Sequence, residues 1–136
     1  MLPLNAYRSL TDFKFYMNEC VASQNIYYED IIGENSLLDH FKCELTENYV
    51  FNQLRENKLI LYYWTSNSQA EVDFITRIGQ DIISIEVKAK INNRARSLMV
   101  YMNKYRLKYA IRISQKNFGF ENRIKSVPLS ATFCIR

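Results

Sequence analysis

The residues with the clearest chemical potential lie between positions 71 and 88. Two carboxylates, Asp73 and Glu86, and one amine, Lys88, occur in two short segments that alternate polar and apolar residues. Such alternation is typical of half-buried β-strands, in which side chains two residues apart share a face. Glu71 is then expected beside Asp73, and Glu86 beside Lys88. If the two segments pair, carboxylates and an ammonium converge on one patch, and carboxylate oxygens are ligands that hard cations prefer.

This set of side chains suits the hydrolysis of phosphodiesters. Asp73 and Glu86 are candidate ligands for Mg²⁺ or Mn²⁺, a cation that lowers the pKa of a bound water and neutralises charge on a phosphate oxygen. Lys88 could orient the attacking water or stabilise charge in the transition state. Glu47 could add a carboxylate if the preceding helix packs over the end of the sheet. The sequence therefore predicts a site at Glu47, Asp73, Glu86 and Lys88.

A plainer interpretation of the same residues is that they are ordinary strand residues. Glu86 and Lys88 could face solvent, and Asp73 could form a common cross-strand ion pair with Lys88. One detail favours a functional role, since aspartate has a low propensity for strands and Asp73 stands between Val72 and Phe74. Locally disfavoured residues are where function is sought first.

The composition indicates one ordinary globular domain. The chain has 136 residues, of which 48% are apolar and 24% charged, and it contains only 3 glycines and 2 prolines. Near the N-terminus no basic start precedes a long apolar run, and no apolar run approaches the roughly 20 residues of a membrane span. These features predict a cytoplasmic location.

Cysteine and histidine offer little support for other site chemistries. The three cysteines, Cys20, Cys43 and Cys134, are scattered, and we expect them to be buried, reduced thiols. His40 is the single histidine, so a Cys/His zinc site or a Ser-His-Asp triad is poorly supported. We expect His40 to lie on a helix surface or in packing.

Charge is distributed unevenly along the chain. Residues 1–70 hold 5 Lys and Arg against 9 Asp and Glu, whereas residues 71–136 hold 13 against 5. A basic half suits a polyanionic partner such as nucleic acid, and Lys90, Arg94 and Arg96 could contact its phosphates. The alternative is a solvated basic surface. Similarly, the aromatic residues 62–64 could stack on bases, although core and sheet-face positions are the alternative we favour.

Periodicity predicts an α/β domain over residues 36–136, preceded by an N-terminal extension over 1–35 that packs on it. We expect a helix over 37–57 with Ser36 as its N-cap, or two helices with a break near Cys43. Three strands at 59–64, 71–77 and 82–89 follow, then a helix at 96–105 and a strand at 109–113. Residues 117–120 are expected to be a loop, and Pro128 to limit regular structure after 124. A strand near 13–17 is a further expectation, and one core should take up Val72, Phe74, Ile85 and Val87.

The order helix, three strands, helix, strand, with its Glu, Asp and Glu-x-Lys, resembles the PD-(D/E)XK, or restriction-endonuclease-like, superfamily. The strings Leu45–Val50, Tyr62–Trp64, Ala70–Ile75, Ile85–Lys88, Lys108–Ser114 and Lys116–Phe120 are similar to the C-terminal domain of many bacterial and archaeal AAA-type ATPases. The resemblance covers residues 36–136 well and 1–35 loosely. It implies a mixed sheet flanked by helices, with core order α-β-β-β-α-β.

The resemblance also implies roles for single residues. Glu47 matches the helix carboxylate, Asp73 and Glu86 the metal ligands, and Lys88 the catalytic lysine. Val72 stands where a proline often precedes the aspartate. The expected activity is divalent-metal-dependent cleavage of DNA.

One part of the related ATPases has no counterpart in this sequence. No phosphate-binding GxxxxGK[ST] loop occurs, so no ATP site is expected, and the chain resembles a remnant, a fragment or a stand-alone C-terminal domain. The alternative function is a non-catalytic domain that binds nucleic acid or docks on a partner in an ATPase system.

Overall fold

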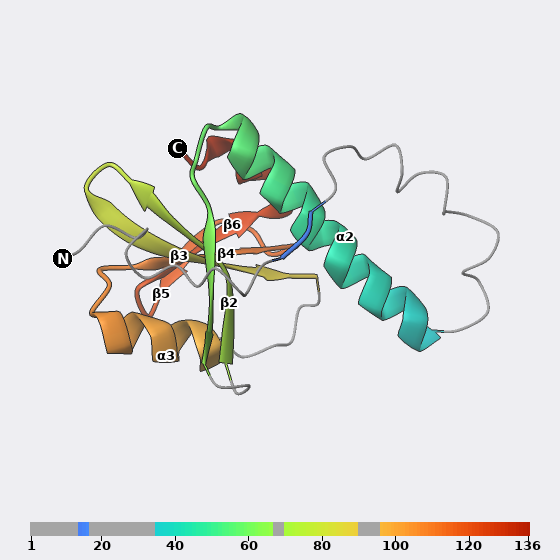
Figure 1. The fold of residues 1–136 in the computed structure, drawn as a ribbon, viewed down its shortest axis with the longest axis horizontal. Coiled ribbons are helices and arrows are strands. Elements are labelled where there is room, and N and C mark those ends of the chain that lie inside the picture. Colours follow the sequence, from blue (N-terminus) through green and yellow to red (C-terminus); the bar gives the residue numbers. More distant parts are fainter. Residues whose placement is uncertain (1–13, 17–34, 67–69, 90–95) are drawn as a thin grey trace.

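The alternating segments of the sequence form the centre of a mixed β-sheet in a computed structural model of the chain (Figure 1). The structure describes residues 14–16, 35–66, 70–89 and 96–136. Its elements are α2 (Asn35–Glu56), β1 (Tyr62–Ser66), β2 (Ala70–Ile78), β3 (Asp81–Lys88), α3 (Arg96–Tyr105), β4 (Ala110–Ser114), β5 (Gly119–Glu121), β6 (Ile124–Pro128) and the 3-10 helix η2 (Leu129–Cys134).

Within the described residues, six strands form one sheet in the order β1-β2-β3-β4-β6-β5. The strands β1, β2 and β3 form an antiparallel meander, and β3, β4 and β6 run parallel to one another. A parallel neighbour requires a crossover, which α3 provides between β3 and β4. The strand β5 is antiparallel to β6 and forms one edge of the sheet. The predicted α/β class with a mixed sheet flanked by helices is confirmed.

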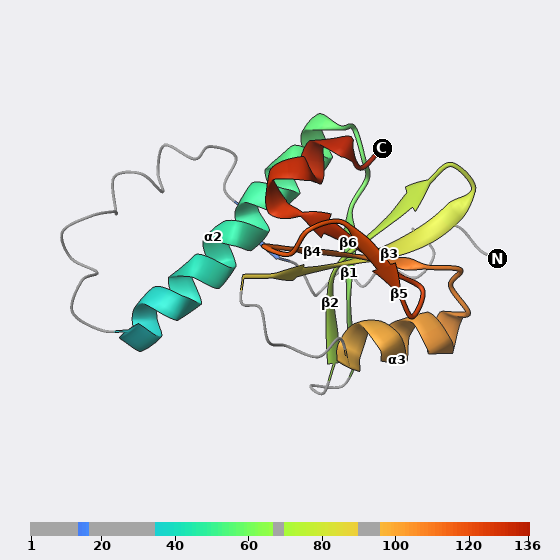
Figure 2. The same cartoon turned by 180° about the vertical axis from the view of Figure 1, so that it is seen from behind.

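The two long helices cover opposite faces of the sheet, as the views from front and back show (Figures 1 and 2). Among the described residues, buried side chains accordingly form two clusters. The α2-side core contains Val50, Leu54, Phe74, Ile83, Ile85, Ile111, Ile113 and Ile135. The α3-side core contains Val72, Ile75, Leu98, Tyr101, Met102, Leu107, Ala110 and Ile124.

The strand β2 carries one residue more than β1 at its centre. Tyr62 pairs with Ile75 and Trp64 with Val72, so two steps on β1 correspond to three steps on β2. This is the geometry of a β-bulge, which breaks the alternation of faces. Phe74 therefore joins the α2-side core while Val72 joins the α3-side core. The expectation that Val72 enters one core with Phe74, Ile85 and Val87 is wrong, because strict alternation does not anticipate a bulge.

The first strand starts later than expected because the backbone N–H groups of Lys58 and Leu59 bond to carbonyls at the end of α2. Lys58 has a φ of 61°, its N–H donates to the carbonyl of Arg55, and the N–H of Leu59 donates to the carbonyl of Leu54. These bonds form a Schellman motif. The strand predicted over 59–64 is therefore β1 over 62–66.

A hairpin at the C-terminal end replaces the loop expected over 117–120. Asn122 and Arg123 join β5 to β6 with φ values of 51° and 62°, as in a type I′ turn. The guanidinium of Arg123 donates to the carbonyl of Leu107 and to Oδ1 of Asn103, which anchors the turn at the end of α3. Pro128 is the last residue of β6, and β6 pairs with β4 and β5, which both precede it in the sequence.

Several smaller predictions also differ from the structure. The helix α2 begins at Asn35 and continues past Cys43, so Ser36 lies inside it and the break near Cys43 is wrong. Cys43 and Cys134 are reduced, but both are exposed rather than buried, since the neighbouring apolar residues take the core positions. Residues 14–16 have no regular structure. The rest of the strand predicted over 13–17, the remainder of the extension, Cys20 and the side chain of His40 lie outside the description.

None of the helices in the described part of the chain is both long and apolar enough to cross a membrane.

Leu54 provides a test of the α2-side core. Its side chain is fully buried, so Leu54→Ala should reduce the free energy of unfolding by about 2–5 kcal/mol through lost contacts and a cavity. The exposed neighbour Glu56 is the control, and Glu56→Ala should change stability by less than about 0.5 kcal/mol. Urea denaturation measures both. Equal effects of the two substitutions would contradict the packing of α2 on the sheet.

Candidate functional site

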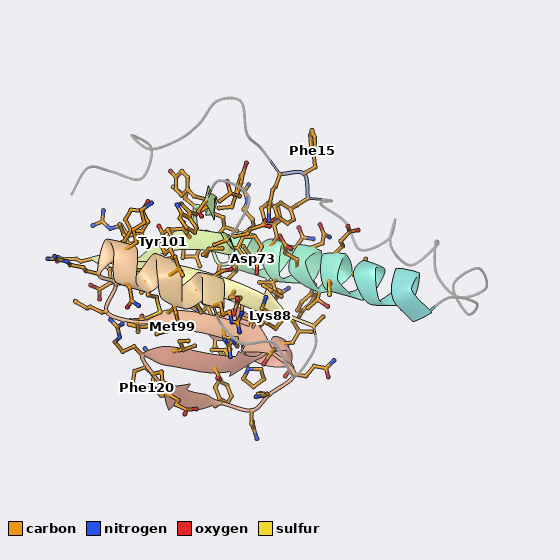
Figure 3. All side chains as sticks on the ribbon, turned by 90° about the horizontal axis from the view of Figure 1, so that it is seen from below. Phe15, Asp73, Lys88, Met99, Tyr101 and Phe120 are labelled. Carbon is orange, nitrogen blue, oxygen red and sulfur yellow. The ribbon has the colours of Figure 1, made fainter. Side chains whose placement is uncertain are left out.

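The four predicted site residues lie on three neighbouring elements. Glu47 is on α2, Asp73 is at the bulge of β2, and Glu86 and Lys88 are near the end of β3. Figure 3 shows Asp73 and Lys88 near each other where α2 passes beside the sheet. The fold therefore brings together the elements that the sequence analysis required.

Asp73 is a largely buried carboxylate. Its Oδ2 accepts a 2.7 Å hydrogen bond from the backbone N–H of Val87 on β3. Burial and the charge of Glu47 raise the pKa of Asp73, while the Val87 hydrogen bond, Lys14 and Lys88 lower it, and the net pKa is about 7. Asp73 thus interacts electrostatically with both Glu47 and Lys88, and its charged form is disfavoured at neutral pH.

Glu86 is neutralised by two cations. Its side chain is only 4% exposed, with Oε1 3.3 Å from Nζ of Lys88 and Oε2 3.2 Å from Nε of Arg112. Arg112 faces Glu86 because the two residues are partners in the parallel register of β3 and β4. The predicted proximity of Glu86 and Lys88 is confirmed, but each carboxylate oxygen already has a positively charged partner.

Glu47 is held by the short segment 14–16. Its Oε1 accepts a 2.6 Å hydrogen bond from the hydroxyl of Tyr16 and lies 3.2 Å from Nζ of Lys14. The ring of Tyr16 stacks on Phe51 with 4.1 Å between centroids. Burial and the hydrogen bond to Glu47 both raise the pKa of Tyr16, so the hydroxyl stays a donor. Glu47 therefore has a fixed position beside β2.

Lys14 also bonds to Glu71, which the sequence analysis placed beside Asp73 without a role. Its ammonium forms ion pairs with both Glu71 and Glu47, and its charge lowers the pKa of Asp73. Burial lowers the pKa of Lys14, but the two glutamates raise it by more, so the net pKa is raised. A single ammonium thus compensates three carboxylates on α2 and β2.

The arrangement can be tested for its fit to a divalent cation. In the described ranges, no three His, Cys, Asp or Glu side chains gather closely enough to hold a metal ion. The carboxylates suit Mg²⁺ or Mn²⁺ in donor type alone, because Lys14 already lies between Glu47 and Glu71 and lowers the pKa of Asp73. A shared ion at Asp73 and Glu86 requires Glu86 to leave Lys88 or Arg112.

The residues predicted to contact nucleic acid are only partly described. Lys90 and Arg94 lie outside the described residues. Arg96 is exposed at the first position of α3, where it could reach a phosphate. Residues 62–64 are partly buried, and Tyr62 and Trp64 pack against the α3-side core, with the Trp64 ring 5.1 Å from Tyr101. The core interpretation is confirmed for Tyr62 and Trp64, whereas Tyr63 belongs to neither core cluster.

Sequence reasoning missed Lys14, Tyr16 and Arg112. Arg112 had a detectable signal, because it alternates with Ile111 and Ile113 and so must lie on the face opposite their side chains. Lys14 and Tyr16 reach the site from a segment without regular structure, 31 residues before Glu47 in the case of Tyr16. No periodic pattern in the sequence indicates that contact.

Comparison with known proteins identifies a family but no characterised relative. The profile of the family described as Domain of unknown function (DUF4143) matches residues 42–132, and the chain belongs to this family. The domain is found in proteins associated with AAA-type ATPases. No curated protein and no solved structure matches the chain.

The raised pKa of Asp73 predicts a pH dependence of stability in metal-free buffer. Below the ordinary pKa of 3.8, the Asp73 carboxyl is protonated in both the folded and the unfolded state, and its contribution to the free energy of unfolding is fully present. That contribution is lost as the pH rises to about 7, because the folded state resists the negative charge that the unfolded state accepts. Asp73→Asn keeps an acceptor for Val87 N–H without the charge, so it should stabilise the fold at pH 8 by roughly 1–3 kcal/mol. Denaturation at pH values from about 4 to about 8 measures this, because that range covers most of the interval between the two pKa values.

The control for this measurement is Asp81→Asn, which removes a carboxylate paired at the surface with Lys108. It should leave the pH dependence unchanged. A fold that becomes more stable on going from pH 4 to pH 7, and a destabilising Asp73→Asn at pH ~8, would show that the Asp73 carboxylate is stabilised as an anion.

Lys14 provides a second test. Lys14→Gln leaves Glu47 and Glu71 without their shared cation, so it should reduce stability at neutral pH by about 1–3 kcal/mol. Lys108→Gln is a matched control, because the Lys108 side chain is 74% exposed and its ion pair with Asp81 is solvated. Thermal denaturation compares them. An effect of Lys14→Gln no larger than that of Lys108→Gln would mean that segment 14–16 does not hold the site.

Proposed function

We propose that this DUF4143-family domain is a divalent-metal-dependent nuclease of PD-(D/E)XK type that cleaves DNA phosphodiesters. The observation that carries the proposal is the environment of Asp73. A partly buried carboxylate lies at a strand bulge and interacts electrostatically with a second carboxylate on α2 and an ammonium on β3, and its pKa is raised to about 7. Strongly shifted carboxylates with specific charged neighbours are characteristic of functional sites.

The order of elements supports the same proposal. A helix that carries Glu47 precedes the meander of β1, β2 and β3, and α3 and β4 follow it. This is the core order implied by the superfamily resemblance, with Asp73 on the second strand and Glu86-Val87-Lys88 at the end of the third. The hairpin of β5 and β6 extends the sheet beyond that core.

In the proposed mechanism, Asp73 and Glu86 would hold Mg²⁺ or Mn²⁺, which would supply an acidic water and neutralise charge on the phosphate. Lys88, 3.3 Å from Glu86 in the structure, donates to the attacking water or to a phosphate oxygen. Glu47 is the further carboxylate, positioned by Tyr16 and Lys14. Arg112 retains Glu86 in position while Lys88 turns to the substrate.

The second candidate is a non-catalytic domain that binds nucleic acid or a protein partner in an ATPase system. The observation that favours it is the pairing of both Glu86 oxygens with cations, which is the state expected of a structural ion network. Asp73 would then be a buried carboxylate without a ligand. The occurrence of the family in proteins associated with AAA-type ATPases suits a role of this kind.

Nicking of supercoiled DNA in Mg²⁺ or Mn²⁺ tests the first candidate. Asp73→Asn and Lys88→Gln should each reduce the rate by at least about 100-fold, since each removes a group that acts on the reacting atoms. The matched controls Asp81→Asn and Lys58→Gln change surface residues of the same types and should cleave like the wild type. Nicking that persists in both site variants would exclude these residues as the source of activity.

Metal titration separates the two candidates. If Asp73 and Glu86 bind Mn²⁺, a concentration 100 times the Kd should raise stability by about 2.7 kcal/mol, and Asp73→Asn should remove that increase. A wild-type protein whose stability is independent of Mn²⁺, together with an Asp73→Asn variant that is more stable at every metal concentration, would favour the non-catalytic domain.

A further inference from the structure

The hairpin of β5 and β6 exposes aromatic rings on a rigid support. Phe118 and Phe120 are each 65% exposed, whereas most other aromatic side chains among the described residues are at least partly buried. Phe118 lies at a bend directly before β5, and Phe120 is the middle residue of β5, so both exposed rings belong to the same short segment of the hairpin. Figure 3 shows Phe120 on the outermost strand of the sheet, away from Asp73 and Lys88.

This exposure is not a consequence of a loose loop. The type I′ turn at Asn122 and Arg123 is anchored by the Arg123 guanidinium to Leu107 and Asn103. The carbonyl of Arg123 also accepts a 2.9 Å hydrogen bond from the N–H of Ala110. A preorganised pair of rings loses little conformational entropy when a ligand binds.

Three basic residues lie in the same segment as the two rings. Lys125 is the cross-strand partner of Phe120, so the two side chains share a face, and its Nζ lies 3.9 Å from the centroid of Tyr109. Lys116 and Arg123 are also exposed, and Glu121 is the only acidic residue between 115 and 128. The surface therefore combines flat apolar rings with ammonium groups, a combination that suits a polyanion with aromatic parts.

We propose that this aromatic hairpin, residues 116–125, binds single-stranded nucleic acid. The bases stack on Phe118 and Phe120, and Lys116 and Lys125 contact the phosphates. Stacking on aromatic side chains requires unpaired bases, and neighbouring cations track the backbone. A second copy of the chain is disfavoured as the occupant, because a two-fold contact at this edge would oppose the same positive charges.

The hairpin is separate from the carboxylate site. In the sheet β4 and β6 lie between β3 and β5, which places the edge about 14 Å from the strand of Glu86 and Lys88 at a strand spacing of ~4.8 Å. The inference therefore requires neither a metal ion nor cleavage. It assigns a nucleic-acid contact to residues other than Lys90, Arg94 and Arg96.

Fluorescence anisotropy with labelled oligothymidylate and oligouridylate of about 12 nucleotides tests the proposal, a length within the range bound by known single-strand sites. The buffer contains EDTA, so that a failed nuclease proposal has no effect on the result. Phe118→Ala and Phe120→Ala should each weaken binding about tenfold, and Phe120→Tyr should restore it, because stacking depends on the ring. Lys125→Gln should weaken binding and reduce its dependence on salt.

The matched control is Phe133→Ala, which removes another exposed ring, on η2. It should bind like the wild type. Equal affinity of the wild type and the Phe118→Ala/Phe120→Ala double variant would overturn the proposal, as would tighter binding of a duplex of the same length. Light scattering that shows a wild-type dimer converted to a monomer by Phe120→Ala would assign the hairpin to self-association instead. Circular dichroism verifies that each variant is folded.

Discussion

The extra residue of β2 opposite β1 determines where both hydrophobic cores and the candidate site lie. It moves Phe74 onto the α2 side while Val72 remains on the α3 side, so one strand contributes to both cores. It also places Asp73 where the carboxylate can accept the Val87 N–H across the strand pair. A regular β2 would align Val72 with Phe74 and point Asp73 away from them.

The bulge has an electrostatic consequence that the surrounding residues compensate. Asp73 is partly buried and interacts with the charge of Glu47, so its charged form is disfavoured. Lys14 from the N-terminal segment lies between Glu47 and Glu71, and Lys88 acts on Asp73 from β3. On β3, Glu86 is compensated separately by Lys88 and Arg112. Lys88 is thus the residue that connects the two groups of carboxylates, which is why it is central to either proposed function.

The parallel strands β3, β4 and β6 provide a cation for Glu86 and the support for the hairpin at the sheet edge. The register of β3 and β4 places Arg112 beside Glu86, and β6 continues the parallel arrangement so that β5 forms the edge. The turn anchored by Arg123 then holds Phe118 and Phe120 in solvent. Three of the cations in the basic half of the sequence belong to this hairpin, so part of the charge asymmetry is concentrated at the β5 edge of the sheet.

Local pattern alone determined the helices, the strands β2, β3 and β4, and the pairing of Glu86 with Lys88, because these depend on periods of 3.6 and 2 residues that are visible in one segment. The local sequence also singled out Asp73 as a candidate functional residue, because aspartate has a low propensity for strands. Only the tertiary structure decided the bulge, the later start of β1, the exposure of the cysteines and the hairpin of β5 and β6. It alone brought Lys14, Tyr16 and Arg112 to the carboxylates. The bulge and the contacts of Lys14, Tyr16 and Arg112 join segments distant in sequence, so they leave no periodic signal in the chain. The cap at Lys58 and the turn at Asn122 and Arg123 are local, but they rest on single residues with positive φ, which the periodicity of apolar residues does not indicate.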